Sequence, residues 1–245
     1  MKAEKFYDGI SSFYDEMISF ESNLARREEF YKKIFDTKKG KVADLGCGSG
    51  LDSIALAKSG FDVAAFDPSD KMIEALKRNA ESYGLQIETG KFGMENIPGK
   101  FDDNFDYAVS MGNTIAHLNK KNLKEGIKRA YEILKPGGTF FLHQLNYDFF
   151  IKNSIRINSI KTGERIIIRF YDFGRKKARF NILEFAAGSP KDYRLHSVTH
   201  YIHNQEELKS MLAEAGFQSV AFYADMNLKP FENKISKEMF ILCRK

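Results

Sequence analysis

The chain has 245 residues, of which 43% are hydrophobic and 29% charged, a composition that supports one large globular domain. Its formal charge of +5 comes from 38 basic and 33 acidic residues mixed along the sequence, so no nucleic-acid-binding face is predicted. No apolar run is long enough to cross a membrane, and the N-terminus lacks the apolar core of a signal peptide. The two cysteines form no disulfide framework, so a cytoplasmic protein is expected.

The first 145 residues alternate between helical and strand patterns. Residues 1–38 read as an N-terminal helical segment, with helical apolar spacing from residue 12 to residue 36. Strands are then expected at Lys41–Leu45, Phe61–Phe66, Leu85–Thr89, Phe105–Ser110 and Thr139–Leu145, and helices at Asp52–Lys58, Ser69–Tyr83 and Lys120–Leu134. This rhythm predicts a parallel sheet with helices on both faces.

The pattern changes in residues 152–203, where strand-like runs follow one another without a helix between them. The runs are Ile155–Ile160, Glu164–Tyr171, Ala178–Phe185 and Leu195–His203. Parallel neighbours would need crossover helices, so an antiparallel β insertion is predicted here, placed as a cover over the acceptor site at the carboxyl end of the fifth strand. A helix at Gln205–Ala215 and strands at Gly216–Tyr223 and Lys237–Cys243 then complete a seven-stranded sheet.

Glycines follow the first predicted strand, where a backbone must turn sharply and approach a ligand. The glycines after Gly46 and Gly48 do not follow the G-x-G-x-x-G spacing of a dinucleotide-binding loop. Asp44, just before them, would repel a pyrophosphate but would suit an ammonium group. Asp67, at the end of the second strand, could accept both hydroxyls of a ribose, or it could only cap the next helix. Together these features predict a site for S-adenosylmethionine.

Four blocks, in order, resemble the glycine and sarcosine N-methyltransferases among the class I S-adenosylmethionine-dependent methyltransferases. The blocks are Gly50–Ile54, Phe66–Met72, Gly112–Leu118 and Asn146–Asp148. The resemblance implies a Rossmann-like fold, with Arg27 at the cofactor carboxylate and Phe92 along the adenine; alternatively, Arg27 is a solvated charge and Phe92 packs in the core. The expected cofactor-binding residues are Arg27, Asp44, Gly46, Gly48, Ser49, Asp67, Pro68, Met72, Phe92, Met111 and Gly112.

The acceptor is expected at the carboxyl edge of the sheet, beside the cofactor. His117 there could take a proton from an amine or hydroxyl, or only bond a loop backbone. The predicted acceptor-side residues are Asn113, His117, Gln144 and Tyr147, with Tyr14, Phe149, Tyr193 and Tyr201 as further aromatic candidates. In glycine-type enzymes an arginine precedes the Asn-Tyr-Asp block. Leu145 stands there and cannot pair with a carboxylate, so glycine use would need another cation such as Arg194.

The predicted function is methyl transfer from S-adenosylmethionine to a small-molecule acceptor at an amine nitrogen. An RNA or tRNA methyltransferase, a small-molecule O-methyltransferase and a non-catalytic cofactor-binding module stay open as alternatives. No membrane partner is expected and nucleic acid is disfavoured. The oligomeric state stays open, and the resemblance to N-methyltransferases implies a homo-oligomer assembled through the N-terminal segment. His196, His200 and His203 lack the cysteine or acidic partners of a metal site, so no metal is expected. The basic turn at 175–177 reads as a solvated hairpin tip.

Overall fold

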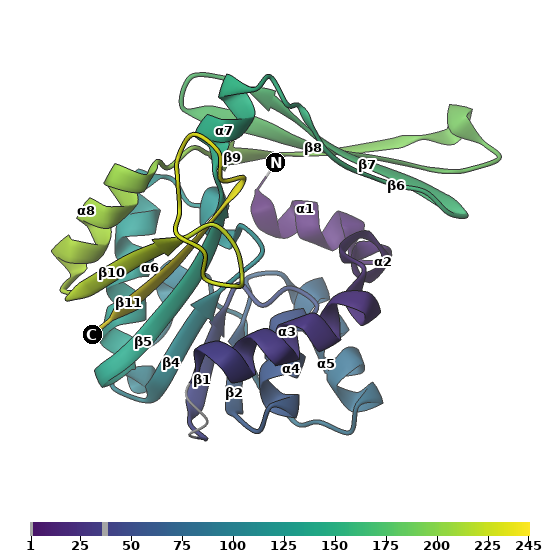
Figure 1. The fold of residues 1–245 in the computed structure, drawn as a ribbon. Coiled ribbons are helices and arrows are strands. Elements are labelled where there is room, and N and C mark those ends of the chain that lie inside the picture. The colour runs from purple at the N-terminus through teal and green to yellow at the C-terminus, as the bar shows by residue number, and fades with distance from the viewer. Residues whose placement is uncertain (1, 36–38) are drawn as a thin grey trace.

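The computed structural model describes residues 2–35 and 39–245, which fold around two β-sheets (Figure 1). The central sheet has seven strands in the order β10-β11-β5-β4-β1-β2-β3. Only β11 runs antiparallel to its neighbours, β5 and β10. The strands are β1 (Lys41–Leu45), β2 (Asp62–Phe66), β3 (Glu88–Gly90), β4 (Phe105–Ser110), β5 (Leu134–Leu145), β10 (Ser219–Tyr223) and β11 (Glu238–Arg244). The predicted seven-stranded, mostly parallel sheet is therefore confirmed.

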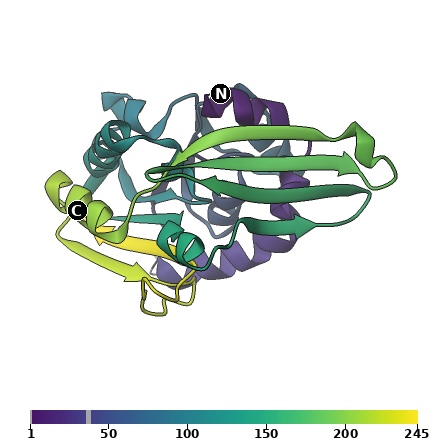
Figure 2. The same ribbon diagram turned by 90° about the horizontal axis from the view of Figure 1, so that it is seen from above.

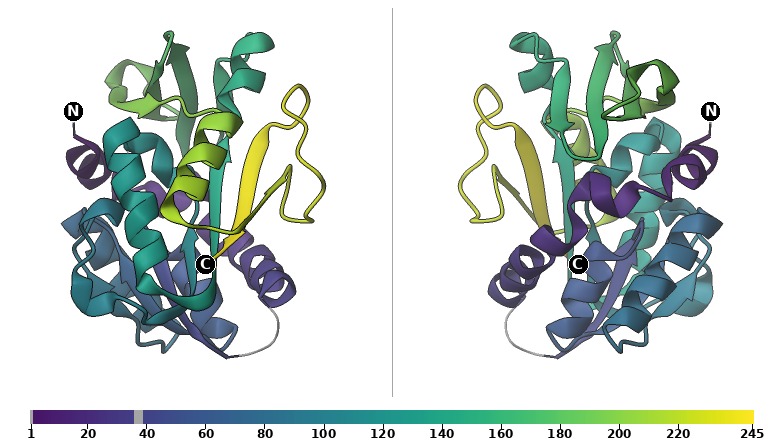
Figure 3. Two further views of the ribbon diagram at one scale, coloured as in Figure 1. Left: turned by 90° about the vertical axis from the view of Figure 1, so that its left-hand side faces the viewer. Right: turned by 90° about the vertical axis from the view of Figure 1, so that its right-hand side faces the viewer.

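Helices cover both faces of this sheet, as the side views in Figure 3 show. One face packs against α3 (Phe20–Ile34), α4 (Leu51–Lys58) and α5 (Asp70–Ser82), and the other against α6 (Lys120–Ile133) and α8 (Gln205–Ala215). Consecutive strand residues point to opposite faces. Phe141 thus enters the first core, whereas Phe140 and Leu142 enter the second.

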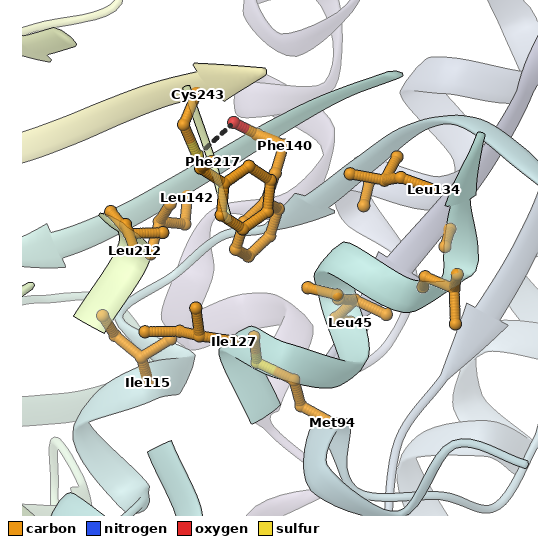
Figure 4. Close-up of a cluster of buried hydrophobic side chains, with 14 of the residues drawn as sticks. Leu45, Met94, Ile115, Ile127, Leu134, Phe140, Leu142, Leu212, Phe217 and Cys243 are labelled. Atoms are coloured by element: carbon orange, nitrogen blue, oxygen red, sulfur yellow. Dashed lines mark hydrogen bonds between the residues drawn. The ribbon is translucent and has the colours of Figure 1, made fainter. Parts of the chain in front are cut away.

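The core beneath α6 and α8 is closed by aromatic and aliphatic side chains from elements far apart in sequence (Figure 4). Phe140 on β5 stacks on Phe217, with 5.9 Å between ring centroids. The Cys243 thiol lies 3.5 Å from the Phe140 carbonyl oxygen, and the thiol is fully buried. Apolar burial of this kind contributes about 25 cal/mol per Å² and holds β5 in place beneath the site described below.

A second, antiparallel sheet lies across the carboxyl edge of the central sheet, as the view from above shows (Figure 2). Its strands β6 (Ile157–Lys161), β7 (Arg165–Phe173), β8 (Lys177–Ala186) and β9 (Arg194–Tyr201) pair in sequence order. The chain enters it through the short helix α7 (Tyr147–Lys152). The antiparallel insertion predicted from the sequence is thus confirmed as a structural element.

The described part of the N-terminal segment, predicted as helical over residues 1–38, contains three helices, and the helical apolar spacing noted from residue 12 onward covers the second and third. Helix α1 (Ala3–Ile10) packs beneath the antiparallel sheet through Phe6, whose ring centroid lies 6.0 Å from that of Phe180. Helices α2 (Tyr14–Ile18) and α3 are separated at Ser19, whose backbone is left-handed with φ of 52°. The predicted end of this segment, residues 36–38, lies outside the described residues.

Strands β3 and β10 each begin three residues later than predicted, because the helix before each strand binds residues that were assigned to the strand. Leu85 donates its backbone N–H to the carbonyl of Ala80, which ties it to the end of α5, so β3 starts only at Glu88. Phe217 bonds Leu212 in the same way at the end of α8. Conversely, β5 begins at Leu134, so the Pro136–Gly138 turn signal falls within a strand. None of the described helices combines the length and apolar character of a transmembrane span.

Candidate active site

A cavity of about 1080 Å³ lies between the carboxyl edge of the central sheet, the N-terminal helices and the antiparallel sheet. A second cavity, of about 870 Å³, adjoins it beside α7 and shares Leu145, Asn158 and Glu238 with it. Ligands of open α/β sheets bind at this edge. Because all three structural layers contribute to the walls, side chains distant in sequence meet here.

The glycine loop forms the floor of the larger cavity. Gly46 and Gly48 have positive φ values of 85° and 54°, in the left-handed region that favours glycine. A Cβ on Gly46 would lie 2.2 Å from Cγ2 of Thr114, so no side chain fits there. The backbone N–H groups of Gly46 and Cys47 both donate to the carbonyl of Phe66, at 2.8 and 3.1 Å. The loop is therefore held against the end of β2.

Asp67 stands at the end of β2 and is only 8% exposed. Its Oδ2 accepts the backbone N–H of Gly48 and its Oδ1 that of Ser69, both at 2.9 Å. Burial raises the pKa of this carboxyl to about 6, although both backbone N–H groups favour the charged form. Asp67 thus both braces the next helix and keeps carboxylate lone pairs at the cavity wall.

Two residues predicted to bind the cofactor do not line the cavity. Asp44 lies beneath the loop, 1% exposed, where Ser53 Oγ donates to its Oδ2 at 2.6 Å and burial raises the pKa of its carboxyl. Met72 is fully buried in α5. The structure brings the other predicted cofactor residues to the cavity: Arg27, Gly46, Gly48, Ser49, Asp67, Pro68, Phe92, Met111 and Gly112.

Arg27 on α3 is held inside the protein and is not a solvated charge on a helix. Its Nε lies 3.4 Å from Oδ1 of Asp52, and its side chain is 17% exposed. Near it, His143 on β5 also lines the cavity, with its ring centroid 4.5 Å from that of Phe240. Burial lowers the pKa of His143 to about 3, and neither ring nitrogen bonds to a described residue. Sequence reasoning missed His143 because it lies inside an apolar strand.

Asn113 belongs to a chain of buried polar groups at the wall of the cavity, which Asn113 and His200 both line. Its Oδ1 accepts the backbone N–H of Leu145 at 3.0 Å, and its Nδ2 donates to the Tyr147 hydroxyl at 2.9 Å. The same hydroxyl is hydrogen-bonded to Nδ1 of His200, also 2.9 Å away. These bonds hold Asn113, Tyr147 and His200 in fixed relative positions.

His117 lies in the 3₁₀ turn Thr114–His117, and its Nε2 is 2.8 Å from the hydroxyl of Tyr7 on α1. Burial lowers the pKa of His117 to about 4, so the imidazole is neutral at pH 7. Burial also raises the pKa of Tyr7 well above its ordinary value, which keeps the phenol protonated. Both residues line the cavity, and Tyr7 was not among the predicted residues.

The remaining predicted acceptor residues lie behind the wall rather than on it. Gln144 is fully buried and donates from Nε2 to the carbonyl of His203 at 2.6 Å, because alternate residues of β5 face opposite sides and Leu145 takes the cavity side. Tyr147 does not line the cavity and approaches it only through its bonds to Asn113 and His200. Of the aromatic candidates, Tyr14 and Tyr201 line the cavity, and Phe149 and Tyr193 do not.

The three histidines near β9 serve different contacts. His196 lies 3.8 Å from Glu184, His200 belongs to the Tyr147 chain, and Nε2 of His203 is 2.8 Å from the carbonyl of Leu118. Within residues 2–35 and 39–245, no group of three His, Cys, Asp or Glu side chains is arranged to hold a metal ion. Arg194 is 77% exposed and does not line the cavity, so the structure does not place it as a carboxylate clamp.

Known proteins resemble this chain in sequence and in fold. The pattern of a methyltransferase domain family matches residues 42–138. A glycine/sarcosine N-methyltransferase of Aphanothece halophytica is 24% identical over 227 residues, covering 90% of this chain and 83% of the relative. An S-adenosylmethionine-dependent methyltransferase from Clostridium acetobutylicum ATCC 824 has a TM-score of 0.77 at 18% identity, over 97% and 98% of the two chains. Together these findings support a class I S-adenosylmethionine-dependent methyltransferase.

Two groups in this cavity are compatible with S-adenosylmethionine. The Asp67 carboxylate lines the cavity and could accept hydroxyl groups, and the Oγ of Ser49 is buried without a partner among the described residues. A sugar N-methyltransferase from Streptoalloteichus sp ATCC 53650 shares the fold as well, with a TM-score of 0.67 at 16% identity over 95% and 93% of the two chains. The family pattern is limited to residues 42–138, whereas much of the cavity wall, including Tyr7, Arg169 and His200, comes from outside that range, so the acceptor has to be argued from the site itself.

Proposed function

We propose that this methyltransferase transfers the methyl group to the amine nitrogen of a small molecule. The observation that carries the proposal is the 2.8 Å contact between the Tyr7 hydroxyl and Nε2 of a neutral His117, at the wall of the cavity. S-adenosylmethionine supplies an already activated methyl group, so the protein has to place the acceptor in line and exclude water. The named relatives that act on nitrogen support the same reaction class.

An amine can attack only with a free lone pair, so its proton has to be handled within the site. The Tyr7 oxygen can accept an N–H of the amine while its own proton is donated to Nε2 of His117. As the nitrogen gains the methyl group, its surplus proton passes to the Tyr7 oxygen and the Tyr7 proton passes to His117. The lowered pKa of His117 keeps its lone pair available at neutral pH.

The cofactor would be held on the other side of the cavity. Asp67 would accept the ribose hydroxyls, Arg27 would pair with the cofactor carboxylate, and Phe92 would pack against the adenine. Asp44, from beneath the loop, braces Ser53 in α4 rather than touching the ligand. The antiparallel sheet within residues 152–203 covers the acceptor and keeps water out, since Tyr171, Phe180 and Val198 present apolar surface to the cavity.

Tyr7→Phe tests this function most directly, because it removes one hydroxyl and leaves the ring. We expect turnover with an amine acceptor to fall by about 10²-fold, with unchanged cofactor affinity. The readout is transfer of a labelled methyl group from S-adenosylmethionine across a panel of small amines. Tyr83→Phe is the matched control, since Tyr83 bonds Glu21 away from the cavity. Wild-type turnover in Tyr7→Phe would remove the pair from the mechanism, and methylation of RNA alone would contradict the proposal.

A further inference from the structure

Arg169 is a cation on the cavity-facing side of the antiparallel sheet. On β7 it lies opposite Ser159 of β6 and Ile182 of β8, and Ile182 is fully buried. Its Nε donates to Ser159 Oγ at 2.6 Å, which fixes the plane of the guanidinium. The residue lines the cavity, as do Tyr7 and Tyr171. Arg169 was missed in the sequence because it looks like one more charge in a strand with polar neighbours.

Arg169 has no carboxylate partner among the residues that the structure describes. Arg165, four residues earlier on the same face, pairs with the buried Glu184, whereas no ion pair forms at Arg169 among the described residues. Its two terminal nitrogens, Nη1 and Nη2, bond to no described residue, and neither is sealed from the cavity. A largely buried charge is costly unless it is paired. Burial indeed lowers the pKa of this guanidinium.

The free edge of the guanidinium has a defined chemistry. With Nε occupied by Ser159, Nη1 and Nη2 form a planar fork that matches the two oxygens of a carboxylate. Leu145, on the opposite wall, supplies no competing cation. Arg169 lines the same cavity as Tyr7, which bonds His117, and its charge interacts with the phenols of both Tyr14 and Tyr7.

We infer that Arg169 binds the carboxylate of the methyl acceptor, so that the substrate is a small amine that also carries a carboxylate. The inference deepens the proposed amine methylation and rests on it. The carboxylate would then be held by the covering sheet rather than by the end of β5, where glycine-type enzymes have an arginine and this chain has Leu145. Arg169 would select the acceptor and orient its nitrogen toward Tyr7, acting as a positioning residue.

The test compares amino acids with the amines that lack only the carboxylate. Protein saturated with S-adenosylhomocysteine is titrated calorimetrically with glycine, β-alanine, phenylalanine and histidine, and with methylamine, ethylamine, phenethylamine and histamine. At least one amino acid should bind ten times or more tighter than its decarboxylated partner, since hydrogen bonds to charged groups contribute about tenfold or more each. Arg169→Met should abolish that preference, and Arg169→Lys should keep part of it.

Arg156→Met is the matched control, because Arg156 is 67% exposed and pairs with Asp172 at the surface. The preference should persist in this variant, and in Arg169→Met cofactor affinity should stay unchanged while KM for the acceptor rises. The inference is overturned if no amino acid binds better than its partner amine, or if Arg169→Met keeps the preference. If amines are methylated and Arg169→Met changes nothing, the inference about Arg169 is refuted and the proposed function is kept. If carboxylates bind through Arg169 but no amine is methylated, the proposed function is refuted.

Discussion

Asp67 should make cofactor binding depend on pH. Burial raises the pKa of its carboxyl to about 6 in the free protein, whereas ribose hydroxyls would donate to the ionised form. Cofactor binding therefore competes with protonation of Asp67. Affinity should be constant near pH 7 and should fall as pH drops through 6, so that binding at pH 5 is about tenfold weaker than at pH 7.

Several other groups of the site do not titrate between pH 5 and pH 7. The pKa values of His117 and His143 are lowered to about 4 and about 3, so both stay neutral there. The carboxyl of Asp44, whose pKa is raised to about 8, stays protonated over the same interval. The free amino group of the cofactor titrates at about 8, above this interval. Glu238 also lines the cavity and burial raises the pKa of its carboxyl, so a slope of affinity against pH is assigned to Asp67 by its loss in a variant of that residue.

The matching variant is Asp67→Asn, which keeps the size of the side chain and removes its charge. The loss of charged hydrogen bonds, at about 1.5–3 kcal/mol, should weaken cofactor binding by about tenfold to 150-fold at pH 7 and make it independent of pH. Asp70→Asn is the control, because Asp70 is 62% exposed and pairs with Lys91 at the surface. Calorimetric titration with S-adenosylhomocysteine measures both effects. Flat wild-type affinity from pH 5 to 7, with unchanged affinity in a folded Asp67→Asn variant, would refute the ribose assignment.

Three further variants address the loop, the cover and acid stability. Gly46→Ala should abolish cofactor binding and should lower the melting temperature more than Gly112→Ala does. Both glycines have positive φ, but nothing lies within 4 Å of an added Cβ at Gly112. Equal losses in the two variants would show that the contact with Thr114 does not restrict position 46. Tyr201→Ala should raise the acceptor KM, whereas Tyr193→Ala, at a 60% exposed site, should match wild type; the reverse order would contradict the cover. Burial depresses the pKa of His143 to about 3 in the folded state, so the stability that this neutral side chain contributes is present above pH 6.5 and is lost as pH falls. His143→Phe should therefore make the melting temperature depend less on pH below 6.5. An unchanged pH dependence of the melting temperature would count against this.

The fold was predictable wherever local chemistry and long-range packing agree. Ser69 reads as an N-cap in the sequence and its Oγ accepts the Met72 backbone N–H in the structure, at 3.2 Å. Helix α1 was not predictable, because eight residues with two buried side chains, Phe6 and Ile10, form a stable helix only by packing beneath another element. That element is the antiparallel sheet, whose position over α1 follows from the whole fold.

The residues expected to bind the cofactor lie close together in the sequence, but those expected on the acceptor side do not. The glycine loop and Asp67 lie within one β-α-β unit, so their spacing indicates a ligand. Tyr7 and His117 are 110 positions apart, and Arg169 comes from a third element. No spacing rule links such residues. The sequence of β5 shows that Gln144 and Leu145 face opposite sides, but not which of them faces the cavity. In the structure Gln144 bonds His203 and Leu145 lines the cavity.

The most direct measurement is the position of the methyl group in the product. The protein is incubated with S-adenosylmethionine labelled in its methyl group and with small amines, amino acids, hydroxylated aromatics and tRNA, and each product is analysed by mass spectrometry and NMR. The account predicts label on the nitrogen of a small amine that carries a carboxylate, with one S-adenosylhomocysteine formed per methyl transferred. Label found only on a hydroxyl oxygen or on RNA would contradict it.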